Sequence, residues 1–428
     1  MDMSTRRVGI TGIGLVSPLG AGAAAHWEQI LAGKSAVKRV ERLARLGFPH
    51  EAAAEVSPEA LAACLPRLSR KQLKLYNRAT TLAMSAAVLA AEDAGIQVSV
   101  PDPIRAGVIL ATLFIPYPIQ SLLPLLPEVE SLEHANQADM GKALKRCMGG
   151  VNPLDLSLKI VPNLTAGHIA ITYGLRGACR TVADAWIGGM QAIAQAATAI
   201  REGELDLVLC GGAECPLEEL VYADLCTTDL LAPPAPSIER TCQPFGRQRC
   251  GTVAGEGAAV LILEALDHAE RRGARVQCEI SGFAAATGTP TADGLSETLG
   301  RAMRAAIAAA GRERVGAIAL HGDAGQMTDL GEARAVGALA HSWGNGLPVY
   351  ATKGAHGNLF SAAAPIEVAT AACALERRML PPSCNCDDVD PACRVAVRTS
   401  PVPFDADTIL VNALGCFGEA ASMVLARA

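Results

Sequence analysis

The chain has 428 residues, of which 50% are apolar and 4% are aromatic, and its formal net charge is −6. This negative balance gives no support for binding to nucleic acid or to an anionic membrane. The first seven residues are polar and carry no signal-peptide core, and no apolar run is long enough for a membrane span. We therefore expect a cytoplasmic protein.

The first half of the chain alternates apolar strands with helical segments. Residues 7–14 predict a short buried strand that runs into a glycine turn, and helical periodicity follows at 26–31. The alanine- and leucine-rich pattern at 78–95 is typical of an amphipathic helix that ends at a glycine. Residues 115–127 carry four prolines and predict an irregular excursion, and residues 205–213 predict a buried strand ending in glycines.

From Gly255 onward the alternation restarts. The predicted strands lie at 258–263, 276–283, 315–320, 349–352 and 409–413, and the predicted helices at 266–272, 300–310 and 361–376. Strands that alternate with helices indicate buried sheets covered by helices, an α/β fold. The two parts, 1–254 and 255–428, are of similar size and suggest an internal duplication.

A strand-to-helix turn near the middle of the chain has the form of a nucleophile elbow. A short strand of small residues at 178–183 leads through a glycine-containing turn into a helical run at 190–201. Such a turn places one side chain at the helix N-terminus, where unpaired amides and the helix dipole stabilise a thiolate or an oxyanion. Here that side chain is Trp186, whose indole cannot be acylated. The sequence therefore predicts an elbow without a nucleophile.

Two further patterns in the sequence resemble cofactor or metal sites. Residues 12–14 resemble the start of a dinucleotide fingerprint, but Pro18 interrupts the helix that should follow, so no nucleotide site is predicted. Cys384, Cys386 and Cys393 lie close together, yet they lack the paired spacing and the neighbouring histidines of a zinc site. We predict no metal and interpret the 14 cysteines as small apolar residues of a reducing compartment.

Several short motifs, taken in order, resemble one known family. They lie at residues 8–14, 166–168, 173–177, 211–214, 244–245, 255–258, 321–322, 352–353 and 381–382. Their order and spacing resemble the β-ketoacyl-acyl carrier protein synthases, the ketosynthase family. This resemblance implies the thiolase fold, in which two duplicated βαβαβαββ halves form a layered α-β-α-β-α architecture.

The resemblance also assigns roles to positions in this chain. Family members catalyse a decarboxylative Claisen condensation, in which a cysteine carries the acyl chain and two histidines donate hydrogen bonds to the malonyl thioester oxygen. The cysteine position falls on Trp186, the first histidine on His321 and the second on Asn358. The family lysine falls on Lys353, and we expect Glu332 to be its partner in a structural ion pair.

A scaffold that is kept while the nucleophile and one histidine are lost resembles one branch of the family. This branch is the chain length factor, or β-subunit, of type II polyketide synthases. The resemblance implies a heterodimer with an active ketosynthase, whose acyl tunnel this chain helps to shape, and a substrate tethered to acyl carrier protein, without any cofactor. Asp323 stands where the family usually has threonine, and residues 361–365 also resemble this branch. Trp186 departs from the glutamine usual there, so polyene-type and aromatic systems both stay open.

Segments that resemble the tunnel wall and the subunit interface supply further candidates. These candidates are Leu113, Phe114, Leu154, Leu156 and Leu158. Ordinary core packing is an equally good interpretation of them. The strand at 178–183 resembles the edge that pairs across the dimer, and its Cys179 is expected to be a buried, inert thiol.

The remaining histidines and the basic residues have less specific interpretations. His168 is expected to be a core histidine, and His356 is a weak candidate to replace the lost base. Arg67, Arg70, Lys71 and Lys74 would suit an acidic carrier protein, but a solvated helix face is the better interpretation.

Two rival functions stay open at this point. One is a malonyl-carrier-protein decarboxylase that uses His321 and Asn358 as oxyanion donors without any nucleophile. The other is a structural homodimer derived from a degenerate synthase. Carbon dioxide release by the isolated protein would favour the first rival, and copurification with a cysteine-bearing ketosynthase would argue against the second.

Overall fold

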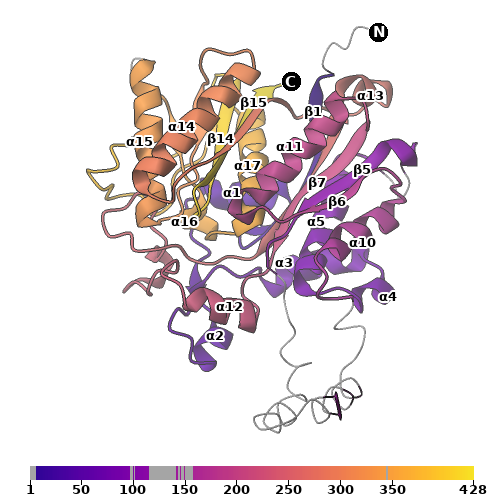
Figure 1. Ribbon diagram of the computed structural model, residues 1–428, viewed down its shortest axis with the longest axis horizontal. Coiled ribbons are helices and arrows are strands. Elements are labelled where there is room, and N and C mark those ends of the chain that lie inside the picture. The colour runs from indigo at the N-terminus through magenta and orange to yellow at the C-terminus, as the bar shows by residue number, and fades with distance from the viewer. Residues whose placement is uncertain are drawn as a thin grey trace.

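A computed structural model describes residues 6–96, 100, 102–114, 141–142, 145, 149, 158–343 and 346–428. The predicted proline-rich excursion at 115–127, together with Leu154 and Leu156, lies outside the described residues. Within the described part, an 11-stranded sheet runs through the molecule and is covered by helices (Figure 1).

Ten strands of the described chain follow one another across the sheet. They are β11 (Val349–Tyr350), β10 (Ala317–Ala319), β14 (Thr408–Leu414), β15 (Glu419–Arg427), β9 (Cys278–Thr287), β1 (Val8–Ser17), β8 (Gly257–Ala265), β7 (Leu207–Glu214), β5 (Ala106–Ala111) and β6 (Cys179–Val182), with β2 (Gly20–Ala21) paired to β1. Two small ribbons lie apart from this sheet, β3 (Lys38–Arg39) with β4 (Ala52–Ala53), and β12 (Met379–Leu380) with β13 (Val402–Pro403).

The long helices are α1 (Ala23–Leu31), α5 (Arg78–Asp93), α10 (Asn163–Tyr173), α11 (Gly188–Arg201), α14 (Ala292–Ala309), α15 (Gln326–Ser342) and α17 (Ala363–Arg377). Shorter helices are α2 (Glu41–Arg45), α3 (Pro58–Cys64), α4 (Arg70–Leu73), α12 (Glu219–Cys226), α13 (Leu266–Arg271) and α16 (Lys353–His356). Two 3-10 turns near the elbow are η4 (Ala185–Ile187) and η6 (Phe360–Ala362).

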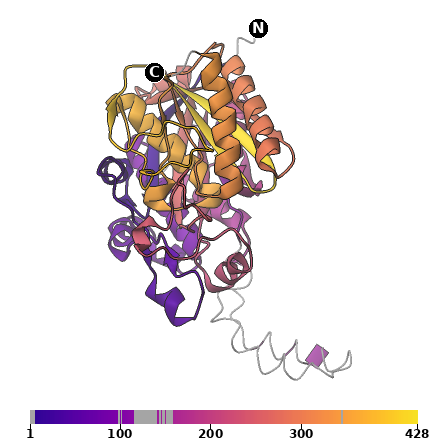
Figure 2. The same ribbon diagram turned by 90° about the vertical axis from the view of Figure 1, so that its left-hand side faces the viewer.

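The helices form layers on both faces of the strands, as the predicted fold class requires. Helices α5 and α10 pack on β1, β8 and β5, and α14 packs on β9 and β15 with α15 against it. Helices α11 and α17 contact each other and lie between the two sets of strands. Figure 1 shows these two helices near the centre, and Figure 2 looks onto the outer α14–α15 layer. The layered α/β architecture is confirmed.

The pairing pattern of the strands repeats in the two sets. From β6 through β5, β7 and β8 to β1, the pairs are parallel, parallel, antiparallel and antiparallel. From β11 through β10, β14 and β15 to β9, the same sequence of pairings recurs. This repetition agrees with a duplicated architecture, and β1 pairs with β9 where the two sets meet. The boundary expected between 254 and 255 stays a prediction. Strand β8 begins after this boundary, yet it pairs with β1 and β7, which both lie before it.

The first strand is longer than the sequence predicts. The glycine turn expected at residues 12–14 is wrong, because β1 continues without a break to Ser17. A Cβ atom on Gly12 would lie 2.4 Å from the carbonyl oxygen of Ala90, and one on Gly14 would lie 2.0 Å from that of Ala86. The glycines are therefore needed for the close approach of α5 to the strand, and not for a turn.

Element boundaries elsewhere differ in ways that local chemistry explains. Helix α14 begins at Ala292, well before the predicted start at 300, because the side chain of Thr291 caps it by accepting from the N–H of Gly294. Helix α15 and strand β15 were not predicted. Among the described residues, none of the helices combines the length and the hydropathy that crossing a bilayer would need.

Candidate functional site

The elbow lies where β6 leads into α11. Strand β6 ends at Val182, the turn η4 follows, and α11 begins at Gly188. Ala185 has a φ of 40°, in the left-handed region that residues with a side chain rarely occupy. Strained backbone of this kind collects at functional turns, where the surrounding structure holds it in place. The turn places Trp186 just before the N-terminus of α11.

Small residues let the start of α11 approach the second half of the chain. A Cβ atom on Gly189 would lie 2.1 Å from the carbonyl oxygen of Ser361, so only glycine fits there. Ser361 belongs to η6, whose Phe360 has a φ of 51°. The elbow and η6 therefore face each other across a very short distance, and their side chains share one space.

The indole of Trp186 fills that shared space. Trp186 is only 4% exposed. Its ring meets the ring of Phe360 edge to face, with centroids 5.3 Å apart, and lies nearly parallel to the His321 ring at 6.5 Å. Phe360 in turn meets Phe114 edge to face at 5.1 Å. Edge-to-face rings at these distances attract one another beyond their burial, so the indole is a packed part of the structure.

The ion pair predicted between Lys353 and Glu332 is wrong. The carboxylate of Glu332 instead accepts the backbone N–H groups of His321, at 2.8 Å, and of Gly322, at 2.9 Å. Asn412 Nδ2 donates to the same carboxylate at 3.0 Å. Burial raises the pKa of Glu332. The role of this residue is to hold the backbone that follows β10.

The partner of Lys353 is Glu367, on α17. Lys353 Nζ lies 3.5 Å from Glu367 Oε1 and donates a hydrogen bond of 2.5 Å to the carbonyl oxygen of His321. Thr352 Oγ1 donates to the same carboxylate at 2.6 Å. Burial by itself would raise the pKa of Glu367, but Lys353 and His356 bring it down to about 2. The buried lysine is thus paired with an ionised carboxylate, as a buried charge requires.

The side chain of His321 lies between a cation and an anion. Its Nδ1 is 3.5 Å from Lys353 Nζ, and its Nε2 is 3.5 Å from Asp323 Oδ2. Within the described part of the chain, His321 Nε2 makes no hydrogen bond. Burial would raise the pKa of Asp323, but the neighbouring His321 and the hydrogen bonds from Thr328 and Gly325 lower it to about 2. Asp323 is therefore an anion at neutral pH.

Asn358 stands fully buried beside the elbow. Its Oδ1 accepts the backbone N–H of Phe360 at 2.9 Å, which orients the amide group. Its Nδ2 has no hydrogen-bond partner among the described residues. Both ring nitrogens of His356 already have neighbours, since its Nδ1 lies 2.8 Å from the carbonyl oxygen of Gly357 and its Nε2 3.1 Å from Thr352 Oγ1.

The other predicted site residues are spread over several environments. Leu113 and Phe114 are half-buried beside Trp186, and Leu158 is half-buried in a turn. His168 is buried against Tyr76, with ring centroids 4.7 Å apart. The expectation of a buried Cys179 is wrong, because β6 is the last strand of the sheet and this side chain is exposed.

Among the described residues, the cysteines and the other potential metal-ligating side chains do not form a metal centre. Cys384, Cys386 and Cys393 are free, buried thiols. In the part of the chain that the structure describes, no group of three or more histidine, cysteine, aspartate or glutamate side chains is placed to hold a metal ion.

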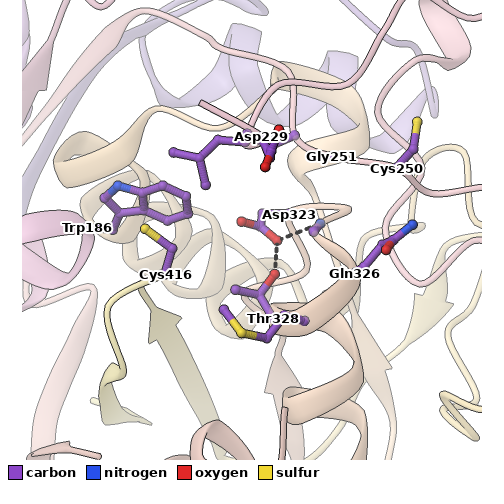
Figure 3. Close-up of a pocket in the computed structure, with 12 residues that line it drawn as sticks. Trp186, Asp229, Cys250, Gly251, Asp323, Gln326, Thr328 and Cys416 are labelled. Carbon is purple, nitrogen blue, oxygen red and sulfur yellow. Dashed lines mark hydrogen bonds between the residues drawn. The ribbon is translucent and has the colours of Figure 1, made fainter. Parts of the chain in front are cut away.

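A pocket of about 340 Å³ opens beside the elbow (Figure 3). The indole of Trp186, the carboxylate of Asp323 and the side chain of Cys416 line its buried part, while Asp229 and Gln326 are exposed at its rim. Among the described residues that line it, none is a lysine or an arginine. Sequence reasoning missed this pocket because its walls come from distant loops, and the only signal was the bulk of Cys416 in a glycine-rich turn.

A buried carboxyl group that sequence reasoning passed over links the elbow to the candidate tunnel residues. Glu214 ends β7 and is fully buried. It accepts the backbone N–H groups of Leu113 and Phe114 and the hydroxyl of Ser361. Burial raises its pKa to about 8, although those hydrogen bonds oppose the shift. The only sequence signal was its place in the motif at 211–214.

Comparisons with known proteins point to one family. Residues 5–269 match the model of the β-ketoacyl synthase N-terminal domain, and residues 273–387 match that of the C-terminal domain. The 3-oxoacyl-[acyl-carrier-protein] synthase 2 of Coxiella burnetii is 29% identical, with 99% of each chain covered. The tetracenomycin polyketide synthase ketoacyl synthase alpha subunit of Streptomyces glaucescens is 30% identical, covering 99% of this chain and 97% of that one.

A solved structure extends the likeness to three dimensions. The structure described as the ishigamide ketosynthase/chain length factor superposes with a TM-score of 0.83 at 25% identity, covering 99% of this chain and 100% of that one. Both domain models and these full-length similarities lead to one conclusion. The chain belongs to the β-ketoacyl synthase family.

Proposed function

We propose that this chain is a non-condensing subunit of the chain length factor kind. It pairs with a cysteine-bearing ketosynthase and shapes the tunnel in which a polyketide or polyene chain grows on acyl carrier protein. The observation that carries the proposal is the buried indole of Trp186 at the elbow, which is 4% exposed.

The chemistry of condensation explains why this observation matters. The family reaction begins when a thiolate attacks the acyl thioester and takes the acyl group. An indole offers no such nucleophile, and its N–H group only donates. The ring also occupies the space between η4 and η6, where it contacts Phe360. This chain therefore has neither the nucleophile nor the room to hold an acyl group at its own elbow.

The charges around His321 argue against the decarboxylase rival. That reaction would need His321 and Asn358 to stabilise a developing oxyanion. The Nε2 of His321 instead faces the carboxylate of Asp323 at 3.5 Å. A fixed anion at this distance repels both an oxyanion and the carboxylate of a malonyl group, and burial strengthens the repulsion. We therefore rank decarboxylation below the subunit role.

The exposed edge of the sheet at β6 supports pairing with another protein chain. Strand β6 ends the sheet order and pairs with β5 alone in the described part of the chain. An unpaired edge offers a row of backbone donors and acceptors to another chain. The ishigamide structure, by its title, contains a ketosynthase and a chain length factor. The name of the Coxiella burnetii relative includes acyl carrier protein.

The test compares the isolated chain with its complex. The chain is incubated with acyl- and malonyl-carrier protein, alone and with a cysteine-bearing ketosynthase, and protein-bound acyl groups and carbon dioxide are measured. We expect no acyl group on this chain and elongation only by the complex. A complex whose ketosynthase carries serine for the nucleophilic cysteine is the matched control and should be inactive.

Each other outcome points to a different function. Elongation by the isolated chain, with a thioester-linked acyl group on it, would overturn the proposal. Rapid carbon dioxide release without elongation would favour the decarboxylase. A homodimer that never copurifies with a ketosynthase would favour the structural role.

A further inference from the structure

The last residue of β7 holds the backbone of the candidate tunnel wall. Glu214 is fully buried there. Its Oε1 accepts the backbone N–H of Leu113, and its Oε2 accepts that of Phe114 at 3.3 Å. The N–H of Thr112, just before them, donates to the carbonyl oxygen of Val182 at 3.1 Å. Three successive N–H groups after β5 therefore have fixed partners.

The same carboxyl group also holds the turn η6. Glu214 Oε1 accepts the hydroxyl of Ser361. Strand β7 contacts η6, and a Cβ atom on Gly212 would lie 2.8 Å from the carbonyl oxygen of Ser361, so the turn lies directly against the end of the strand. Phe360, which precedes Ser361, donates its N–H to Asn358 Oδ1 at 2.9 Å. One side chain thus links the two segments that carry Phe114 and Phe360.

The rings on these two segments meet each other beside the elbow. Phe114 and Phe360 lie edge to face with centroids 5.1 Å apart, and Phe360 meets Trp186 in the same way at 5.3 Å. Such pairs attract at centroid separations of about 4.5–7 Å. The position of a ring follows from its backbone and from side-chain torsions with few allowed values. The backbone that Glu214 holds therefore decides whether Phe114 reaches Phe360.

We infer that Glu214 is a positioning residue of the proposed tunnel, which limits product length by holding Phe114 against Phe360. The inference rests on the proposed function and names a determinant of product length within it. It does not depend on the charge of the carboxyl group, because a protonated carboxyl group still accepts hydrogen bonds. It depends on two acceptor oxygens on one side chain, which glutamine does not offer.

The experiment uses Glu214→Gln, which keeps the size of the side chain but turns an amide NH₂ group, a donor only, toward one of the N–H groups. Hydrogen–deuterium exchange at Leu113 and Phe114 is measured in the isolated chain. At least one of these amides should exchange about tenfold faster, because the segment opens more often without its hydrogen bond. In a complex with an active ketosynthase, mass spectrometry should show a shift to longer products.

A double variant tests whether Glu214 acts through the ring of Phe114. The product distribution of Phe114→Ala/Glu214→Gln should match that of Phe114→Ala alone, because a ring that is absent cannot be displaced. Two residues with independent effects would instead give additive shifts. Ser361→Ala removes one donor and keeps both backbone hydrogen bonds, so its shift in product length should be smaller than that of Glu214→Gln.

Glu264→Gln is the matched control for a general loss of stability. Glu264 is also fully buried, but it lies at the other end of the β7–β8 pair, where it accepts from Thr11 and Arg272. Its variant should lower the free energy of unfolding while exchange at 113–114 and product length stay unchanged. Should Glu214→Gln fail to fold, Ser361→Ala, alone and combined with Phe114→Ala, takes its place in both measurements.

Three results would overturn the positioning role of Glu214. They are unchanged exchange at Leu113 and Phe114, faster exchange with the product length of the unmodified chain, and additive shifts in the double variant. All three appear only in variants and leave the proposed function intact. That function fails separately, when the unmodified chain elongates by itself or when its complex with a ketosynthase does not elongate.

Discussion

The elbow and the network around Lys353 lie side by side, yet they differ in what they have kept. In the network, Lys353 is paired with Glu367, and the carboxylate of Glu332 accepts from the backbone after β10. At the elbow, the indole of Trp186 is buried and packed, and the Nδ2 of Asn358 has no hydrogen-bond partner among the described residues. The charged groups that stabilise the backbone are satisfied, whereas under the proposed function the positions that would perform chemistry are blocked or unpartnered.

This contrast has a physical reason. A buried ion pair cannot lose one partner without leaving an isolated charge in the interior, so its loss costs the fold. A nucleophile can be replaced by a larger apolar ring if the ring packs, because packing supplies the stabilisation. A chain that keeps its fold but not its reaction would retain the first kind of group and lose the second.

The strongest test of the contrast removes one partner from the network. Lys353→Ala leaves the charged carboxylate of Glu367 in the interior without its lysine partner, so we expect a loss of about 3–5 kcal/mol in the free energy of unfolding. Urea denaturation measures it. The double variant Lys353→Met/Glu367→Gln is the control and should lose much less, because no isolated charge is left. A loss below about 1 kcal/mol in Lys353→Ala would mean that the network does not stabilise the fold.

A second test uses the pH dependence of stability. The pKa of Glu214 is raised to about 8 in the folded chain, above the ordinary value near 4.5. The native state therefore holds a proton that the unfolded state releases, and its contribution to stability is complete below the unfolded pKa. That contribution declines by about 1.4 kcal/mol per pH unit as pH rises toward the folded pKa.

Glu214→Gln carries no titrating group, so the difference in unfolding free energy between it and the unmodified chain should change with pH across this window. Urea denaturation of both proteins at several pH values checks it. If this difference in unfolding free energy stayed constant with pH, Glu214 would be ionised throughout. The interior beside the elbow would then stabilise a carboxylate as well as the network around Lys353 does.

The third test addresses the wall of the proposed tunnel. Phe114 meets Phe360, which contacts Trp186, so Phe114→Ala opens space beside the elbow. In a complex with an active ketosynthase, we expect longer products by mass spectrometry. Phe48→Ala is the matched control, because Phe48 packs against the same cluster, where its ring meets that of Tyr222 at 5.3 Å. Unchanged product length in an intact complex would assign Phe114 to packing alone.

The smallest effect is expected on the surface. Arg67 pairs with Glu92 at 2.8 Å, and both side chains are about half exposed, at 41% and 52%. Exposed pairs contribute about 0–1 kcal/mol, so Arg67→Ala should scarcely change the unfolding free energy or the rate of elongation by the complex. Glu92→Ala is the control for the pair. A marked fall in elongation for Arg67→Ala alone, reversed at low salt, would instead assign Arg67 to carrier-protein docking.

Local patterns in the sequence were enough to predict several features of this protein. The alternation of strands and helices, the long helix α5 and the strand-to-helix turn that carries Trp186 all depend on residues that are neighbours along the chain. Periodicity, capping and turn chemistry act over a few residues, so they leave a readable signal. The resemblance to the ketosynthases supplied the positions of His321, Asn358 and Lys353.

Tertiary structure alone decided which groups face one another. Lys353 pairs with Glu367 and not with Glu332, because α17 places the carboxylate of Glu367 beside the lysine. The carboxylate of Glu332 instead accepts hydrogen bonds from the backbone after β10. Asp323 faces His321, and β15 contacts the elbow turn from the far end of the chain. The interaction between buried charges depends on the distance between them in the folded chain. The order of residues along the chain does not give that distance.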